Sequence, residues 1–310
     1  MNTPPQRLFI LAGMPRTATT FLYQRFQEHP AIFCPYRKET NFFSVNYHKG
    51  SAWYRKLYAD MADGQTGADV SPVYFLDEHA IDRMRAFEPR TPVILGVRPA
   101  SEWALSWYTQ VLSNHVGTKP SFEEFVTGYE LRISGGEIWQ DFRSGFVRRM
   151  IERYRDSFGD DLLLYHYRAL RDEPLALLNS IELFLGLPRH FSEENVSNEI
   201  VNAGTRRNIG FIADLLSRER FVEAVGRLVP RRLVQAARNA YVALGTSKVA
   251  AESPSFTDEE VALAKEIFAE DDRWIESLFS DSSIQLGSSG TFITLEYRDG
   301  MGGTPDERDL

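Results

Sequence analysis

One stretch near the N-terminus, residues 7–26, constrains the fold more than any other part of the chain. It begins with a continuous apolar run, residues 8–12, followed at once by Gly13. Short apolar runs of this kind are typical of parallel strands covered on both faces. The next residues include three with hydroxyl groups, Thr17, Thr19 and Thr20. After them, apolar residues follow at helical spacing. The pattern predicts a strand, a tight turn and a helix start, an arrangement that binds anions.

The spacing of this turn is similar to that of the Walker phosphate loop, G-x-x-x-x-G-K-[ST]. Gly13 and Thr20 lie at its first and last positions, but Ala18 replaces the second glycine and Thr19 replaces the lysine. Arg16 is the nearby cation, and its guanidinium fork suits a phosphate. The turn therefore predicts phosphate binding without the lysine of an ATPase.

A second buried strand is expected over residues 91–97, and it ends on Arg98. An ATPase would need an aspartate at such a strand end to hold Mg²⁺. A cation there favours a second phosphate instead, and Ser106, eight residues on, adds a hydroxyl from the following helix. The alternative is that Arg98 forms a structural ion pair.

These residues resemble the sulfotransferases that use 3′-phosphoadenosine-5′-phosphosulfate (PAPS). In that family the 5′-phosphosulfate loop commonly reads P-[KR]-x-G-T-T, and residues 15–20 are similar to it. The family's 3′-phosphate motif reads R-x-P-x-x-R-A-x-S-x-Y, and Arg98 and Ser106 keep its spacing, although the proline and inner arginine are displaced or lost. The resemblance implies an α/β fold of the P-loop NTPase type, with a mostly parallel central sheet flanked by helices. It also implies PAPS as co-substrate and no metal.

The resemblance assigns the cofactor-binding residues. The 5′-phosphosulfate would be held by Pro15, Arg16, Thr17, Ala18, Thr19 and Thr20. The 3′-phosphate would be held by Arg98 and Ser106, with Arg206 and Arg207 in a basic loop that closes over it. An exposed basic turn is the alternative for the last two residues.

A third motif of the family, K-E-x-H-F-F, is matched by Lys38, Glu39, Phe42 and Phe43, with Asn41 in place of the histidine. The family's glutamate is proposed to take the proton of the acceptor. Glu39 is accordingly the expected general base, and Lys38 and Arg16 are expected to contribute charge to catalysis. The alternative is a solvated Lys–Glu pair on a loop.

Two further stretches bear on the acceptor. Asp69, in residues 67–74, stands where the family's G-E-x-S-P-x-Y stretch lines the acceptor side of the cleft; the alternative is that it caps the turn at Ser71. Residues 114–137 are expected to be an irregular loop that sets acceptor specificity.

The remaining sequence is expected to be scaffold. Helices are predicted over residues 146–158, up to Gly186, and over 255–279, with strands at 162–167 and 292–297. We expect a single sulfotransferase-like domain over residues 1–300 and a disordered tail over 301–310.

Net charge and cysteine content limit the kinds of binding partner and the cellular location that are expected. The 310 residues carry a net charge of −8, which argues against nucleic acid as the main partner. The single cysteine cannot form an internal disulfide, and no leader or transmembrane segment is evident, so a cytoplasmic location is expected. This departs from the membrane-anchored carbohydrate sulfotransferases of animals and is consistent with a bacterial relative.

The sequence therefore predicts sulfuryl transfer from PAPS to a hydroxyl or amine of a carbohydrate, lipid or small metabolite. Two alternatives remain open. A P-loop nucleotide or small-molecule kinase would share the fold, and a non-catalytic nucleotide-binding module would keep the phosphate loop without turnover. The oligomeric state is not determined by the sequence.

Overall fold

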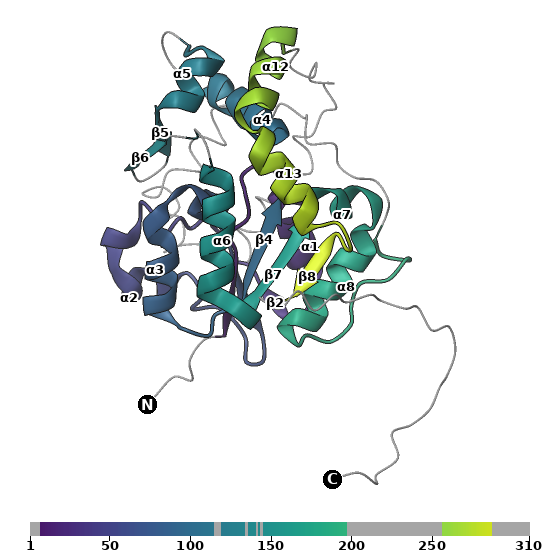
Figure 1. Ribbon diagram of the computed structural model, residues 1–310. Helices are drawn as coiled ribbons and strands as arrows, with labels where there is room; N and C mark the ends of the chain where they lie inside the picture. Colours follow the sequence, from purple (N-terminus) through teal and green to yellow (C-terminus); the bar gives the residue numbers. More distant parts are fainter. Residues whose placement is uncertain are drawn as a thin grey trace.

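A six-stranded, mostly parallel sheet lies at the centre of the protein in the computed structural model (Figure 1). The structure describes residues 7–114, 119–133, 136–140, 142, 145–196 and 256–286. In spatial order the strands are β2 (Ile32–Phe33), β3 (Thr66–Val70), β1 (Leu8–Leu11), β4 (Val93–Val97), β7 (Leu162–His166) and β8 (Ile284–Leu286). The first five run parallel, and β8 pairs antiparallel with β7. The predicted fold class is confirmed.

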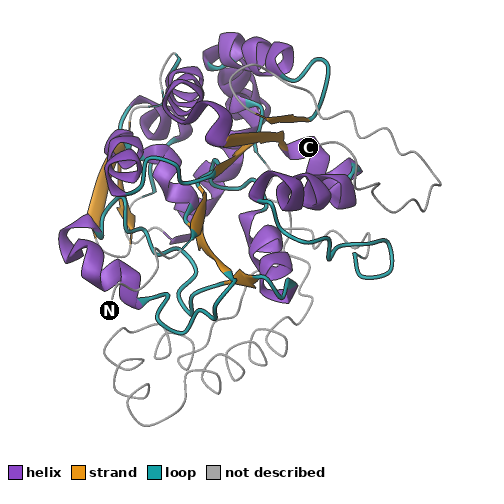
Figure 2. Ribbon diagram, turned by 90° about the horizontal axis from the view of Figure 1, so that it is seen from below, coloured by secondary structure: helices purple, strands orange, loops and turns teal. Residues whose placement is uncertain are grey.

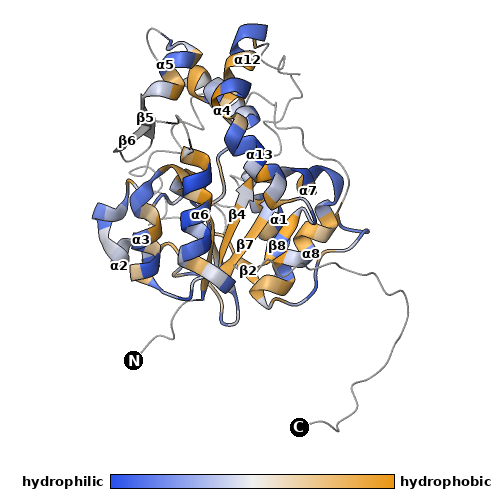
Figure 3. Cartoon of the chain, viewed as in Figure 1, coloured by the Kyte–Doolittle hydropathy of each residue, from blue (hydrophilic) through white to orange (hydrophobic). Residues whose placement is uncertain are grey.

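Alternation along the strands divides the core into two layers. In β1, Leu8 and Ile10 face one apolar cluster, whereas Phe9 and Leu11 face the other, as the two-residue period of a strand requires. The first cluster is covered by α3 (Glu78–Phe87), α4 (Ala100–Asn114) and α6 (Phe146–Phe158), and the second by α1 (Thr19–Glu28) and α8 (Pro174–Leu185). Helices therefore lie on both faces of the sheet (Figure 2). Apolar residues are concentrated in the strands and on the helix faces that meet them (Figure 3).

The register of β1 and β4 places the ends of both strands together. Ile10 pairs with Val93 and Leu11 with Ile94, and beyond the strands the N–H of Met14 donates to the carbonyl oxygen of Gly96 at 3.0 Å. The chain leaves β1 for α1 and leaves β4 for α4. Because ligands of open α/β sheets bind at the carboxyl ends of the strands, this edge is the expected position of a site.

The remaining elements include several that differ from the sequence-based expectations. Residues 114–137 are not a simple loop: they contain α5 (Phe122–Thr127), with a Ser121–Glu124 capping box, and most of an antiparallel hairpin formed by β5 (Tyr129–Ile133) and β6 (Gly136–Gln140). The single helix expected over 255–279 is two helices, α12 (Asp258–Ile267) and α13 (Ala269–Leu278). The predicted strand at 292–297, Arg206, Arg207 and the tail lie outside the described residues. The short elements are η1 (Tyr47–Lys49), α2 (Gly50–Lys56), η2 (Pro72–Leu76), η3 (Gly159–Asp161) and α7 (Tyr167–Asp172).

Two aspartates of α13 cap other helices. An Asp271 carboxylate oxygen accepts from the N–H of Arg148 in α6 at 3.2 Å. An Asp272 oxygen accepts from the N–H of Ser101 in α4 at 3.1 Å. Both donors lie in the first turn of their helix, where N–H groups lack partners within the helix. The late helix α13 is thereby joined to the helix that carries Ser106. None of the helices in the described ranges combines the length and apolar character that crossing a bilayer requires.

Candidate functional site

The turn between β1 and α1 has the geometry of an anion-binding loop. Arg16 and Ala18 both adopt left-handed backbone conformations, with φ of 70° and 57°. The hydroxyl of Thr17 donates to the carbonyl oxygen of Met14 at 2.7 Å, and the hydroxyl of Tyr165 donates to the carbonyl oxygen of Thr17 at 3.0 Å. Ala18 is the N-cap of α1 and makes no side-chain cap hydrogen bond. The N–H of Phe21 donates to the carbonyl oxygen of Ala18 at 2.9 Å, so the N–H groups that an anion could use are those that precede Phe21.

Two glycines let this turn press against β4. A Cβ atom on Gly13 would collide with the backbone nitrogen of Gly96. A Cβ atom on Gly96 would collide with the hydroxyls of Tyr165 and Thr17. The close approach explains the glycine two residues after β1, and it shows a role for Gly96 that the sequence pattern did not reveal.

The structure brings the first loop and the helix after β4 together. The Arg16 Nε atom donates to the Ser106 hydroxyl at 3.1 Å, and its Nη1 donates to the Gln110 side-chain oxygen at 3.2 Å. Gln110 lies one helical turn beyond Ser106 and was not singled out from the sequence, although its spacing of four residues is a detectable signal. Pro15, Thr17 and Thr19 are buried supports of the loop, whereas Thr20 is exposed.

Arg98 lies beside the same loop. Its guanidinium packs over the Tyr167 ring at 4.8 Å, and its Nε lies 3.2 Å from a carboxylate oxygen of Glu102. The ion pair expected as the alternative role is therefore present. Burial, together with the charge of Arg98, lowers the pKa of Arg16. Two neighbouring guanidinium groups repel each other, and a bound dianion would relieve that repulsion.

Lys38 connects its neighbour Glu39 to Thr20, at the end of the turn between β1 and α1. Its ammonium donates to the Thr20 hydroxyl at 3.3 Å and to the Glu39 carboxylate at 3.0 Å. The Glu39 side chain is 44% exposed and that of Lys38 is 18% exposed, so the side chain of Glu39 is the more accessible of the two. The Lys–Glu pair expected as the alternative is thus present, but it lies against the first turn of α1 instead of in open solvent.

Backbone strain is concentrated in these two segments. Within the described part of the chain, the non-glycine residues with positive φ are Arg16, Ala18, Glu39 and Asn41. Such conformations are costly for residues with a Cβ, and they cluster at functional sites because the surroundings must enforce them. The two segments meet through Lys38, so the strain marks a single place at the carboxyl edge of the sheet.

Asp69 does not line an open cleft. It is fully buried in β3 and accepts hydrogen bonds from four hydroxyl groups. One of them belongs to Ser71, as the turn-capping alternative predicted, and another belongs to Thr40, next to Glu39.

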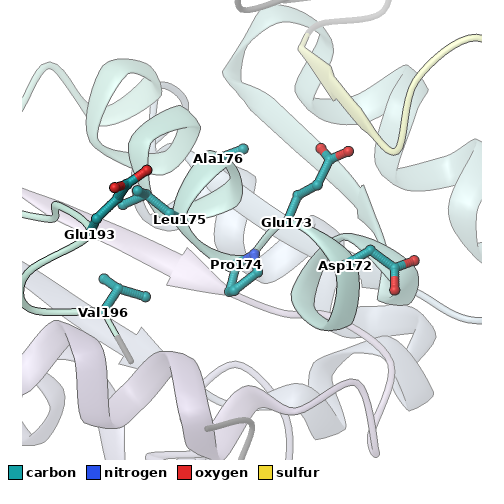
Figure 4. A pocket seen from close by; sticks show the side chains of 7 residues that line it. All are labelled: Asp172, Glu173, Pro174, Leu175, Ala176, Glu193 and Val196. Atoms are coloured by element: carbon teal, nitrogen blue, oxygen red, sulfur yellow. The ribbon is translucent and has the colours of Figure 1, made fainter. Parts of the chain in front are cut away.

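Two cavities lie around α7 and the start of α8. One, of about 410 Å³, includes Asp172, Glu173 and Glu193 in its lining, together with Pro174 (Figure 4). The other, of about 370 Å³, includes His166, Arg168 and Glu276 in its lining. The acidic lining of the first is unsuited to a phosphate, so it is not the anion site.

The sequence is similar to those of known sulfotransferases. The model of the sulfotransferase domain family matches residues 6–206. Mouse heparan sulfate glucosamine 3-O-sulfotransferase 3A1 is 30% identical over 189 residues, 60% of this chain and 47% of its own. Human heparan sulfate glucosamine 3-O-sulfotransferase 6 is 29% identical over 195 residues, 62% and 55% of the two chains. This chain spans about half the length of the curated relatives it matches. A solved sulfotransferase from Alicyclobacillus acidocaldarius superposes with a TM-score of 0.49 at 19% identity, covering 64% of this chain and 86% of that one.

Proposed function

The chain belongs to the sulfotransferase domain family, and from this premise we propose that it transfers a sulfuryl group from PAPS to a hydroxyl or amine of an acceptor. One observation carries the proposal. Lys38 contacts both Thr20 of the phosphate loop and Glu39, so an anion-binding helix start and a carboxylate are held side by side. A phosphate-binding loop alone would serve many reactions, but a base next to it supports transfer to a protic acceptor.

The residues at the carboxyl edge are suited to PAPS. When bound, PAPS supplies the activated sulfuryl group and PAP as the leaving group. The first turn of α1, with Thr19, Thr20 and Arg16, would hold the 5′-phosphosulfate. Arg98 and Ser106 would hold the 3′-phosphate, and Arg206 and Arg207 are further candidates by their position in the sequence.

Glu39 is proposed as the general base. Its carboxylate would accept the proton of the acceptor hydroxyl or amine. The cations Lys38 and Arg16 would stabilise the negative charge that develops on the departing oxygen. Since an arginine stays protonated, Arg16 would contribute charge and hydrogen bonds rather than a proton.

The acceptor is proposed at the level of class: a carbohydrate, a lipid or a small metabolite. Because the curated relatives are named for heparan sulfate glucosamine, a glucosamine-containing polysaccharide is the first acceptor to test. We also propose one domain over residues 1–300 with a tail over 301–310, and the cytoplasmic location stays a prediction.

Donor recognition is tested by calorimetric titration of the protein with PAP, ADP and Mg-ATP, repeated on Arg98→Ala. We expect PAP to bind more tightly than ADP and the preference to be lost in the variant. Equal affinities for PAP and ADP would contradict the proposed 3′-phosphate site. Tightest binding by Mg-ATP would favour the kinase alternative.

The base is tested with Glu39→Gln, using Glu88→Gln, an exposed glutamate elsewhere, as the matched control. We expect Glu39→Gln to lower kcat by about 10²- to 10⁴-fold, the range for general bases, while PAP binding is retained. Equal loss of turnover and PAP binding would show that Glu39 supports the donor site instead. Tight PAP binding with no turnover by the unmodified chain on any acceptor would favour a binding module.

A further inference from the structure

We propose that Asp69 is a positioning residue for Glu39, which it holds in place through Thr40 and Ser71. The inference rests on the proposed function, because it concerns the placement of the proposed base. It goes beyond the expected roles of Asp69, since a fully buried carboxylate neither lines the acceptor side of a cleft nor serves a single turn.

Asp69 is the centre of a buried hydrogen-bond network. Its Oδ2 atom accepts from the hydroxyls of Thr40 at 2.8 Å, Tyr54 at 2.9 Å and Tyr74 at 2.8 Å. Its Oδ1 atom accepts from the Ser71 hydroxyl at 2.7 Å. Asp69, Thr40, Ser71 and both tyrosines are almost completely buried. Hydrogen bonds in the low-dielectric interior of a protein strengthen one another, and a network whose groups all have partners fixes a single conformation of the residues in it.

The network is attached to each residue of the turn that presents the proposed base. The N–H of Glu39 donates to the carbonyl oxygen of Val70 at 3.0 Å. Thr40 reaches Asp69 through its hydroxyl, and the N–H of Asn41 donates to the Ser71 hydroxyl at 3.1 Å. Three consecutive turn residues are therefore bound to residues 69–71 at the end of β3.

These bonds explain how the turn keeps its unfavourable backbone. Glu39 and Asn41, on either side of Thr40, have φ of 64° and 49°. A left-handed conformation at two residues with side chains persists only where the surroundings enforce it. The Thr40 hydroxyl is one of two side-chain links between the strained pair and Asp69, the other being the Ser71 hydroxyl, and its loss should let the turn relax.

The other side of the network is anchored in the aromatic core. The Tyr54 ring stacks on Phe42 with centroids 4.4 Å apart and an interplanar angle of 9°. The N–H of Phe43 points to the Tyr74 hydroxyl at 3.3 Å, and the Asn46 side chain donates to the carbonyl oxygen of Thr40 at 2.8 Å. Hydrogen bonds to the side chains and the backbone of the turn, and to the residues that follow it, therefore fix its position. The Glu39 side chain is the exposed part of the turn.

The test uses a matched pair at Thr40. Thr40→Val keeps the shape and removes the hydroxyl, whereas Thr40→Ser keeps the hydroxyl. Turnover is followed as PAP released from PAPS with a mixed pool of heparan sulfate and hydroxyl- and amine-bearing metabolites. We expect Thr40→Val to lower kcat by about 10- to 100-fold, the cost of a base displaced by about an ångström, with PAP affinity and the KM for PAPS unchanged. Thr40→Ser should retain most of the activity.

A double variant separates positioning from stability. If Thr40 acts through Glu39, then Glu39→Gln combined with Thr40→Val should be no slower than Glu39→Gln alone. Unchanged kcat in Thr40→Val with a lowered Tm, or fully additive losses in the double variant, would overturn the inference. If Thr40→Val does not fold, Ser71→Ala takes its place, because Ser71 joins Asn41 to Asp69 in the same network.

The outcome also separates this inference from the proposed function. Full activity of Glu39→Gln would refute the base itself, whatever Thr40→Val does. An inactive Glu39→Gln together with a fully active Thr40→Val and Ser71→Ala would leave the base in place and refute only the role of Asp69.

Discussion

The sharpest prediction concerns His166, at the carboxyl end of β7, and the perturbation is a fall in pH. Its Nδ1 atom accepts hydrogen bonds from the backbone N–H and the Nε of Arg168, both at 3.1 Å, so the ring caps α7 in its neutral form. The residue is 1% exposed. Burial, reinforced by the charge of Arg168, lowers the pKa of His166 from 6.5 to about 4.

The magnitude follows from these two pKa values. Because the pKa is lower in the folded protein, the stabilisation is fully present above about pH 6.5 and is lost as the pH falls towards 4. The difference between 6.5 and about 4 corresponds to about 3 kcal/mol in the free energy of unfolding. About 2 kcal/mol of this is lost between roughly pH 7.5 and pH 5.

The assay is urea unfolding at these two pH values for the unmodified chain and for His166→Asn. Asparagine keeps a side-chain acceptor at the N-cap but does not titrate. The unmodified chain should lose about 2 kcal/mol more than the variant, since all other groups titrate in both. Parallel losses in the two proteins would refute the reasoning. Because Tyr167 follows His166 and packs on Arg98, PAP affinity of the unmodified chain should also fall at the lower pH.

Two further predictions concern the supports of the site. Gly13→Ala should destabilise the protein by about 1–3 kcal/mol in urea unfolding and weaken PAP binding, because the alanine methyl group would collide with the backbone of Gly96. Unchanged PAP affinity would contradict the close approach of the turn to β4. Asp272→Ala should cost about 1 kcal/mol of stability by removing the cap of α4, whereas the exposed Glu259→Ala should change it by less than about 0.5 kcal/mol. Equal effects of these two variants in the same assay would show that the Asp272 cap does not matter.

The sequence predicted the elements whose signals are local. The apolar run after Arg7 forms β1, the helix over 146–158 is α6, and Gly186 ends α8 in a left-handed conformation. Each depends on periodicity or on a glycine stop, which a single segment contains. The break between α12 and α13 at Phe268 was not predicted, because the amphipathic pattern continues across it.

The sequence predicted the motif residues of the candidate site but not the residues that hold them in position. Arg16, Glu39 and Ser106 were identified from motifs, and the structure places Arg16 beside Ser106. The roles of Gln110 and Thr40 depend on contacts between segments far apart in the chain, which no local pattern contains. Asp69 was noticed only as part of a motif, because its burial and its four hydroxyl partners arise from tertiary packing.

The late elements α13 and β8 have a consequence for how the protein is made. A ribosome completes every motif residue from Gly13 to Ser106 long before it reaches Asp271 and Asp272, which cap α6 and α4. Strand β8, which covers the edge of β7, is also translated late. The nascent chain would therefore carry an uncapped α4 and an open sheet edge until its last third emerges. The family-matched segment, residues 6–206, lacks these pieces, so we expect a fragment cut at that boundary to be less stable than the full chain.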